Sequence, residues 1–179
     1  MMKISKDEIV KYAERYDYKE TLDESVEREL KELLKNQKYL NKEQFIRLCK
    51  WKSPRPKKHY ESNGESSIIE ATKLSFAAKS DLERIEPLLK LKGVSYPVAS
   101  AILHFAFPDE YPILDFRAIW SLCGQTRDGY LWTKYCDEIR KVSENLNLPI
   151  RIVDKALWKY SKENQPKQNE TRGRKVCSR

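Results

Sequence analysis

The sequence predicts an all-α protein, with one compact helical domain over residues 1–162 and a basic tail over 163–179. Apolar residues recur every three or four positions along most of the 179-residue chain, which is the period of one face of a helix. Ser-x-x-Glu patterns, which cap helix N-termini, precede two of these stretches. No segment alternates apolar and polar residues over the length of a strand, and five glycines are too few for a many-turned β-sandwich.

Four helices are predicted in the N-terminal half. Ser5 and Glu8 form the first capping box, and the apolar residues that follow recur at helical spacing. The leucine-rich segment 23–37 predicts the second helix, and Asn41 is expected to begin the third as its N-cap. The fourth helix is predicted over 66–78 from its apolar spacing.

The segment 51–60 is predicted to be a loop with a strong positive charge. Pro54 and Pro56 break a helix there, because each lacks a backbone N–H and clashes with the preceding turn. The lysines and arginine around these prolines can contact phosphates, and a solvated surface loop is the alternative interpretation.

The C-terminal half continues the helical pattern. A capping box at Ser80 begins the fifth helix, which contains Pro87 and ends at Gly93. The next helix has Pro97 in its first turn, where the missing N–H costs little. Asp115 opens a short helix after a proline-containing loop. Two amphipathic helices complete the domain, over about 129–146 and about 150–162.

Composition limits the partners of the protein. There are 35 lysines and arginines against 27 aspartates and glutamates, and the pI is about 9.2. This balance is compatible with nucleic acid, an anionic membrane surface or an acidic protein as partner. Six basic and two acidic residues lie in 161–179, so half of the net charge of +8 belongs to a tail expected to be disordered. No run approaches the roughly 18 apolar residues of a membrane span, and no membrane partner is expected.

The four cysteines are widely scattered, at positions 49, 123, 136 and 177. No pair has CxxC spacing, so neither a metal site nor a cofactor is expected. The N-terminus lacks the apolar stretch of a signal peptide. We therefore expect reduced thiols in a cytoplasmic, monomeric protein.

The segment 88–103 predicts two apolar helices joined by a very short turn. Gly93 allows a positive φ in that turn, Val94 can fill the space between the helices, and Ala99 is small where the helices cross. A tight turn before a helix N-terminus directs several free backbone N–H groups outward, and the helix dipole adds partial positive charge. The turn is therefore a candidate phosphate-binding surface, and an ordinary helix–helix corner is the alternative.

Two short motifs in this region resemble those of a known superfamily. Residues 91–99 read Leu-Lys-Gly-Val-Ser-Tyr-Pro-Val-Ala, and Ile113, Leu114 and Asp115 follow after one helix. This is similar to the helix-hairpin-helix DNA glycosylases of the endonuclease III-like type, which carry Leu-x-Gly-Val-Gly-x-Lys-x-Ala, a helix, and an aspartate after an apolar residue. Eighteen positions separate Pro97, at the place of the family's lysine, from Asp115, as in that family.

The resemblance implies a helix-hairpin-helix fold, double-stranded DNA as partner and excision of a modified base. It implies that Asp115 is catalytic, since a carboxylate at a helix N-terminus stays ionised and can stabilise a positively charged sugar and orient a water. The implied DNA-binding residues are Lys92, Gly93, Val94, Ser95, Tyr96, Val98, Lys52, Ser53, Arg55 and Arg117. The implied base pocket or wedge consists of Trp51, Tyr60 and His104.

Several departures from the family pattern limit the expected chemistry. Pro97 stands where bifunctional members carry the lysine that forms a Schiff base, so lyase activity by that route is excluded unless another lysine substitutes. Ser95 replaces the second glycine, and Arg117 stands where a histidine follows the aspartate. The segment before the hairpin is short, and the cysteines that bind a cluster are absent.

These observations predict a monofunctional DNA glycosylase that hydrolyses the N-glycosidic bond. The first alternative is a helix-hairpin-helix DNA-binding module without catalysis, and the second is a helical protein-interaction domain. Individual residues also have simpler interpretations: Asp115 as a helix N-cap, Trp51 as a core anchor and His104 as a buried, hydrogen-bonded histidine.

Overall fold

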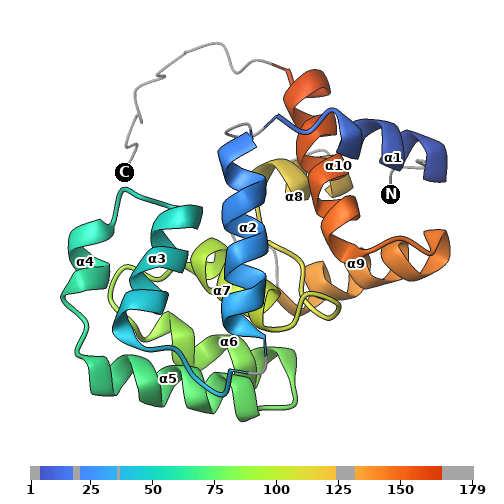
Figure 1. The fold of residues 1–179 in the computed structure, drawn as a ribbon. Coiled ribbons are helices and arrows are strands. Elements are labelled where there is room, and N and C mark those ends of the chain that lie inside the picture. Colours follow the sequence, from blue (N-terminus) through green and yellow to red (C-terminus); the bar gives the residue numbers. More distant parts are fainter. Residues whose placement is uncertain (1–4, 18–20, 36, 124–131, 167–179) are drawn as a thin grey trace, which may run out of the picture.

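The computed structural model describes residues 5–17, 21–35, 37–123 and 132–166 (Figure 1). These residues form ten α-helices and no strand, so the all-α prediction is confirmed. In this part of the chain no helix combines the length and the apolar character needed to cross a bilayer. The helices are α1 (Lys6–Glu14), α2 (Thr21–Leu34), α3 (Lys42–Lys52), α4 (Lys57–Glu61), α5 (Glu65–Ala77), α6 (Asp81–Leu89), α7 (Tyr96–Ala106), α8 (Phe116–Cys123), α9 (Trp132–Leu146) and α10 (Ile150–Asn164).

Three helices begin at the caps that the sequence predicts. Ser5, Asn41 and Ser80 each accept a hydrogen bond from the backbone N–H three residues on. The Glu or Gln at that third position accepts from the N–H of the cap in return, which satisfies two otherwise free donors. Local sequence therefore sets these three helix starts.

The segment 51–60 differs from the predicted loop. Helix α3 continues to Lys52 and α4 begins at Lys57, so only residues 53–56 are irregular. Pro54 lies in that short connection, and Pro56 lies at the N-cap of α4, outside the hydrogen-bonded interior of either helix. The prolines therefore shorten the connection between two helices without creating a long loop.

Other helix ends also differ from their predicted positions: α2 ends at Leu34 and α6 at Leu89. Helix α10 extends to Asn164, beyond the predicted domain end at 162. Helix α9 begins at Trp132, and the predicted residues 129–131 lie outside the described residues, as does the tail from 167 onward. Pro87 is accommodated in the last turn of α6.

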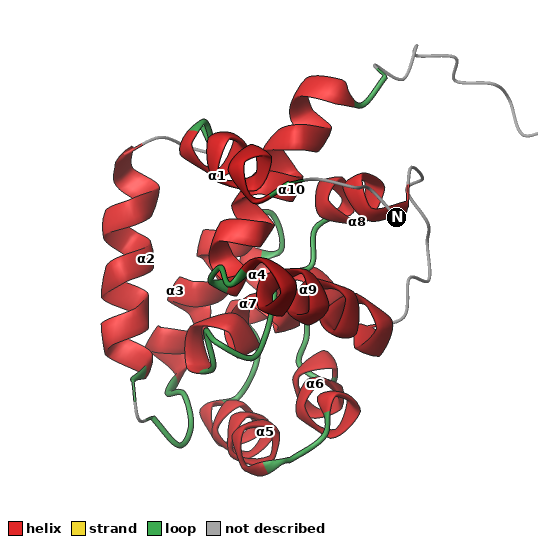
Figure 2. Ribbon diagram, turned by 90° about the vertical axis from the view of Figure 1, so that its right-hand side faces the viewer, coloured by secondary structure: helices red, strands yellow, loops and turns green. Residues whose placement is uncertain are grey.

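The helices form two groups that meet where α6 packs against α9. All residues of α7 from Val98 to Phe105 are buried, and α2, α3 and α6 pack against this helix. The second group consists of α1, α8 and α9 packed on α10, on the right in Figure 1. The N-terminal helix thus packs on the C-terminal one, and Figure 2 shows α5 and α6 side by side at the opposite end of the molecule.

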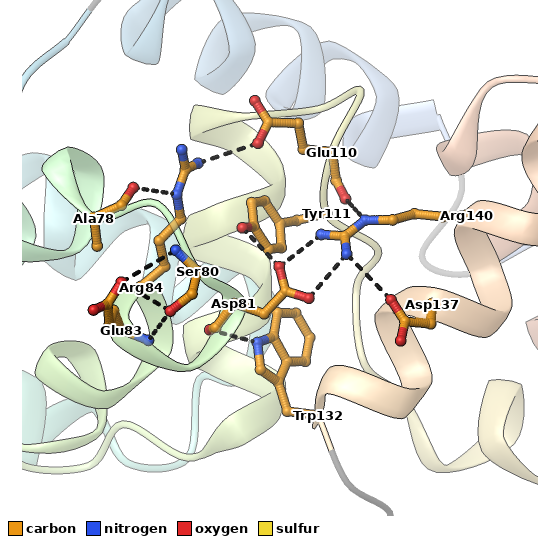
Figure 3. A network of polar contacts seen from close by, with 10 residues as sticks. All are labelled: Ala78, Ser80, Asp81, Glu83, Arg84, Glu110, Tyr111, Trp132, Asp137 and Arg140. Carbon is orange, nitrogen blue, oxygen red and sulfur yellow. Dashed lines mark hydrogen bonds and ion pairs between the residues drawn. The ribbon is translucent and has the colours of Figure 1, made fainter.

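A polar network joins the two groups through α6 and α9 (Figure 3). Arg140 donates two hydrogen bonds of 2.8 Å to the Asp81 carboxylate, which also accepts one from the Tyr111 hydroxyl at 2.9 Å. The Trp132 indole N–H donates to the Asp81 carbonyl at 3.0 Å. Burial opposes ionisation of Asp81, but the bonds from Arg140 and Tyr111 prevail and lower its pKa.

Candidate nucleic-acid and catalytic site

The turn between α6 and α7 has a conformation that requires glycine. Gly93 has a φ of +83°, and a Cβ on it would lie 2.8 Å from His59 Cβ and 3.0 Å from two ring carbons of Tyr60. The Asn63 side chain fixes the turn, because it accepts from the Lys92 N–H at 2.8 Å and donates to the Lys92 carbonyl at 3.0 Å. The turn is therefore anchored on α4 and on the residues that follow it.

Free backbone donors lie at this turn. Within the described part of the chain, the N–H groups of Gly93, Ser95 and Tyr96 have no acceptor. Ser95 is the N-cap of α7 but makes no side-chain capping bond, and both Ser95 and Tyr96 are exposed. Exposed basic residues lie on α4 and next to the turn in the chain: Lys57, Lys58, Lys90 and Lys92.

Asp115 lies at the N-terminus of α8 and has two kinds of partner. Its Oδ1 accepts the N–H of Arg117 at 3.0 Å, so the interpretation of Asp115 as a helix cap holds. Its Oδ2 is 3.0 Å from the Nζ of Lys52, at the end of α3. The side chains of Asp115 and Lys52 are 21% and 15% exposed, so this ion pair lies at the edge of the core.

A small pocket lies beside this pair, between the two groups of helices. Its volume is about 30 Å³, which is enough for one or two water molecules. A cavity that binds benzene measures about 150 Å³, so a nucleobase does not fit this pocket as it stands. The pocket is lined by Tyr16, Trp51, Lys52, Ile113, Asp115, Ala118, Arg151, Asp154 and Trp158.

A second carboxylate, Asp154 on α10, lines the same pocket and is almost completely buried. Its Oδ2 accepts the N–H of Ile113 at 2.8 Å, whereas its Oδ1 has no partner. Burial raises the pKa of Asp154 to about 7, although Arg151, the Ile113 N–H and Lys52 act in the opposite direction. The nearby Asp115 raises this pKa further. Trp51 contributes a second unpartnered buried atom, its indole Nε1.

Sequence reasoning missed Asp154, although a signal was present. Its position falls on the apolar face of the last predicted helix, where an acidic residue is expensive to bury. An aspartate in such a stripe indicates either a structural hydrogen bond or a functional site. The apolar residues of this face are Ile150, Val153 and Leu157.

Two sets of contacts connect the neighbourhood of the turn with that of Asp115. The Ser100 hydroxyl on α7 accepts a hydrogen bond from the N–H of Leu114 at 2.9 Å. This bond attaches Leu114, the residue before Asp115, to helix α7. Ser100 is five residues beyond Ser95, or about 7.5 Å along the helix axis. In addition, Tyr60, whose ring touches Gly93, donates to the Ser53 carbonyl, next to Lys52, at 3.1 Å.

Two residues predicted for a base pocket or wedge lie entirely in the core. The Tyr60 ring is inaccessible, and its hydroxyl is bonded to the Ser53 carbonyl. His104 is also fully buried, with its Nδ1 2.8 Å from the Tyr111 carbonyl oxygen. Burial, helped by the charge of Arg151, lowers the pKa of His104 to about 3. Neither ring is accessible to a base.

The remaining predicted residues are distributed around the site. Trp51 packs edge-on against Phe105 with 4.9 Å between ring centres, and it lines the pocket. Val94 and Val98 are buried, and their N–H groups donate to the carbonyls of Leu91 and Ser95, so neither residue has a free donor for a phosphate. Arg55 is exposed in the short connection between α3 and α4.

Arg117 and Phe116 form the outer edge of the site beside Asp115. The Arg117 guanidinium lies 5.2 Å from the ring centre of Phe116 and 5.4 Å from that of Trp158. Phe116 is 55% exposed, and no pattern in the sequence singles it out. An exposed aromatic ring next to a carboxylate and a guanidinium is suited to stacking on a base or a sugar.

No group of three metal-ligating side chains occurs among the residues that the structure describes. Comparisons with protein-family models, with curated proteins and with solved structures find no significant match to this chain.

Proposed function

We propose that this protein binds duplex DNA through a helix-hairpin-helix motif made by α6, the turn at Gly93 and α7. We further propose that it removes a modified base by hydrolysis of the N-glycosidic bond at Asp115. The observation that carries the proposal is the bond between Ser100 and Leu114, because it holds the carboxylate close to the free N–H groups at the start of α7.

The proposed DNA contact uses the backbone at the turn. Phosphate oxygens accept from the N–H groups of Gly93, Ser95 and Tyr96, and the dipole of α7 favours the negative charge. The exposed lysines on α4 and the turn add attraction that does not depend on base sequence. Arg55 extends this basic surface beyond α3.

The proposed chemistry rests on the charge of Asp115. As the bond between C1′ and the base breaks, the sugar becomes positively charged, and a fixed carboxylate stabilises it. The ammonium group of Lys52, 3.0 Å from this carboxylate, offsets that stabilisation. In the proposed reaction the Lys52 side chain therefore moves from Asp115 to a DNA phosphate when the duplex binds.

Excision also requires the pocket to open. Trp51 on α3 and Trp158 on α10 lie on its two sides, and the present volume of about 30 Å³ excludes a base. Movement of the Trp158 side chain away from Trp51 on DNA binding is thus part of the proposed function, and Phe116 is placed to stack on the displaced nucleotide.

The test is base release from duplexes that carry a panel of lesions, followed by alkali to cleave abasic sites. Asp115→Asn keeps the cap for the Arg117 N–H but removes the charge, so base release should fall about 10²–10³-fold with little change in DNA affinity. Asp81→Asn, which removes a partly buried, hydrogen-bonded carboxylate outside the pocket, is the matched control and should retain activity. Equal rates for Asp115→Asn and the unaltered protein would disprove the catalytic assignment.

The small pocket favours a second candidate function, a DNA-binding module without catalysis. Such a module uses the same turn and basic surface, and its affinity for duplex DNA falls steeply with salt. Salt-dependent binding together with no base release from any lesion would favour this second function.

A further inference from the structure

Two side chains that line the pocket each carry a buried polar atom without a protein partner. The Trp51 indole Nε1 is a donor and the Asp154 Oδ1 is an acceptor, and both belong to side chains that line the pocket beside Asp115. Buried polar atoms are nearly always hydrogen-bonded, because an unpaired one has lost its hydrogen bonds to water and gained none in return. An unpaired donor and an unpaired acceptor at one cavity therefore indicate a ligand that both accepts and donates.

We propose that this pocket is a binding site for one water molecule, held by Trp51 Nε1 and Asp154 Oδ1 next to Asp115. The pocket volume of about 30 Å³ has room for such a water. The water oxygen accepts from the indole N–H, and one water hydrogen donates to Asp154. Further polar groups on the wall, from Lys52 and Asp115, provide the additional partners that a buried water needs.

The charges around the pocket disfavour an ion at this place. Lys52 and Arg151 repel a cation, while Asp115 and Asp154 repel an anion. Among small ligands, a neutral molecule that accepts two hydrogen bonds and donates two can satisfy the polar groups of this wall without a charge conflict.

The water also has a role that rests on the proposed function. It is the nucleophile: its oxygen forms a bond to C1′ of the sugar while the bond from C1′ to the base breaks. The electron pair of the broken bond leaves with the base, which takes up a proton from solvent. One proton of the water passes to Asp154 Oδ1, and Asp115 stabilises the sugar during the exchange.

Asp154 is placed to accept this proton near neutral pH. The groups that act on it are Arg151 on its own helix, Lys52 on α3, Asp115 before α8, the Ile113 N–H and Cys136 on α9. With a pKa of about 7, the carboxylate form that can accept a proton grows as the pH rises to neutrality. Base release should therefore rise about tenfold per pH unit below 7 and level off above it.

The site itself is tested by high-resolution crystal structures of the full chain and of Trp51→Phe. We expect an ordered water within about 2.7–3.2 Å of both Trp51 Nε1 and Asp154 Oδ1, and its loss in the variant. The phenyl ring retains the contact with Phe105, so the fold is preserved. An empty pocket, or a protein group bonded to these two atoms, would overturn the proposal.

The role of the water is tested by single-turnover base release as a function of pH. Asp154→Asn keeps an oxygen for the Ile113 N–H but cannot accept the proton, so release should be slow and independent of pH, with unchanged DNA affinity. Asp81→Asn should keep the original pH profile, since it lies outside the pocket. An unaltered profile in Asp154→Asn would refute the role of Asp154 and leave the glycosylase function intact. If the unaltered protein releases no base, the glycosylase function fails, and the crystal structures still decide whether the water site exists.

Discussion

The Nζ of Lys52 lies 3.0 Å from the Oδ2 of Asp115, although the two residues are 63 positions apart in the chain. This ion pair links the end of α3 to the start of α8, one from each group of helices. Pro97 stands at the place of the lysine in the glycosylase pattern on which the proposed function draws. An ammonium group nevertheless reaches the aspartate, from a different helix.

The strength of this ion pair is measurable in a double-mutant cycle with Lys52→Met and Asp115→Asn. Because both side chains are mostly buried, we expect a coupling of about 1–2 kcal/mol in the free energy of unfolding. The exposed pair Lys57–Glu61, with side chains 53% and 45% exposed, should couple by less than about 0.5 kcal/mol. Urea unfolding monitored by circular dichroism gives both coupling energies. Equal values for the two pairs would contradict the burial of the Lys52–Asp115 pair.

Gly93→Ala should destabilise the protein by about 1–3 kcal/mol. The new Cβ would be in a left-handed backbone conformation and 2.8 Å from His59 Cβ. Gly64→Ala is the matched control, because Gly64 has an ordinary φ and its nearest neighbour would be Ser67 Oγ at 3.8 Å. The urea midpoints of the two variants measure how much each substitution destabilises the protein. A smaller destabilisation by Gly93→Ala than by Gly64→Ala would contradict the tight, left-handed turn at Gly93.

Ser95→Asp separates folding from DNA binding. Aspartate is as good an N-cap as serine and suits the positive end of α7, so stability should be maintained. The added carboxylate repels phosphate, and the affinity for duplex DNA should fall about tenfold or more. In fluorescence anisotropy over a salt series, the dependence of log affinity on log salt should become shallower by about 0.9 for each phosphate that is no longer neutralised. Unchanged binding would mean that DNA does not contact the turn.

Asp154 should make folding less favourable as the pH rises. Its folded pKa of about 7 exceeds the unfolded value of 3.8, so the folded state binds more protons between these values. The stabilisation is complete below about pH 4 and disappears as the pH rises to about 7. Thermal unfolding of Asp154→Asn should not show this decline.

His104 changes the folding stability in the opposite direction over much of the same pH range. Its folded pKa of about 3 is below the unfolded value of 6.5, so stability rises with pH between about 3 and 6.5. The two effects oppose each other in the unaltered protein. Asp154→Asn should therefore become more stable with rising pH, whereas His104→Gln should become less stable. If both variants showed the same pH dependence of stability, the opposite pKa shifts assigned to Asp154 and His104 would be wrong.

The helices were largely predictable because their signals are local. The capping boxes at Ser5 and Ser80 and the cap at Asn41 act over three residues, and each begins a helix in the structure. The segment 51–60 was harder, since the prolines there predict a break but not its length. Burial of Tyr60 against Gly93, a tertiary contact, anchors α4 within that segment.

The candidate site was only partly predictable for the same reason. Asp115 is indicated by its position before a helix, and the turn at Gly93 by its sequence. The pairing with Lys52 and the approach of Asp154 depend on how distant helices pack, and no spacing in the sequence encodes that. Exposure of a ring is likewise tertiary, which is why Tyr60 was selected and Phe116 was not.

The proposed function requires the turn at Gly93 and the carboxylate of Asp115 to act on one duplex. A crystal structure of the protein bound to DNA with a stable abasic-site analogue would show whether they do. We predict phosphate oxygens about 3 Å from the backbone nitrogens of Ser95 and Tyr96, with the sugar of the analogue against Asp115. A duplex bound to another face, with Asp115 still paired to Lys52 and away from DNA, would contradict the proposed function.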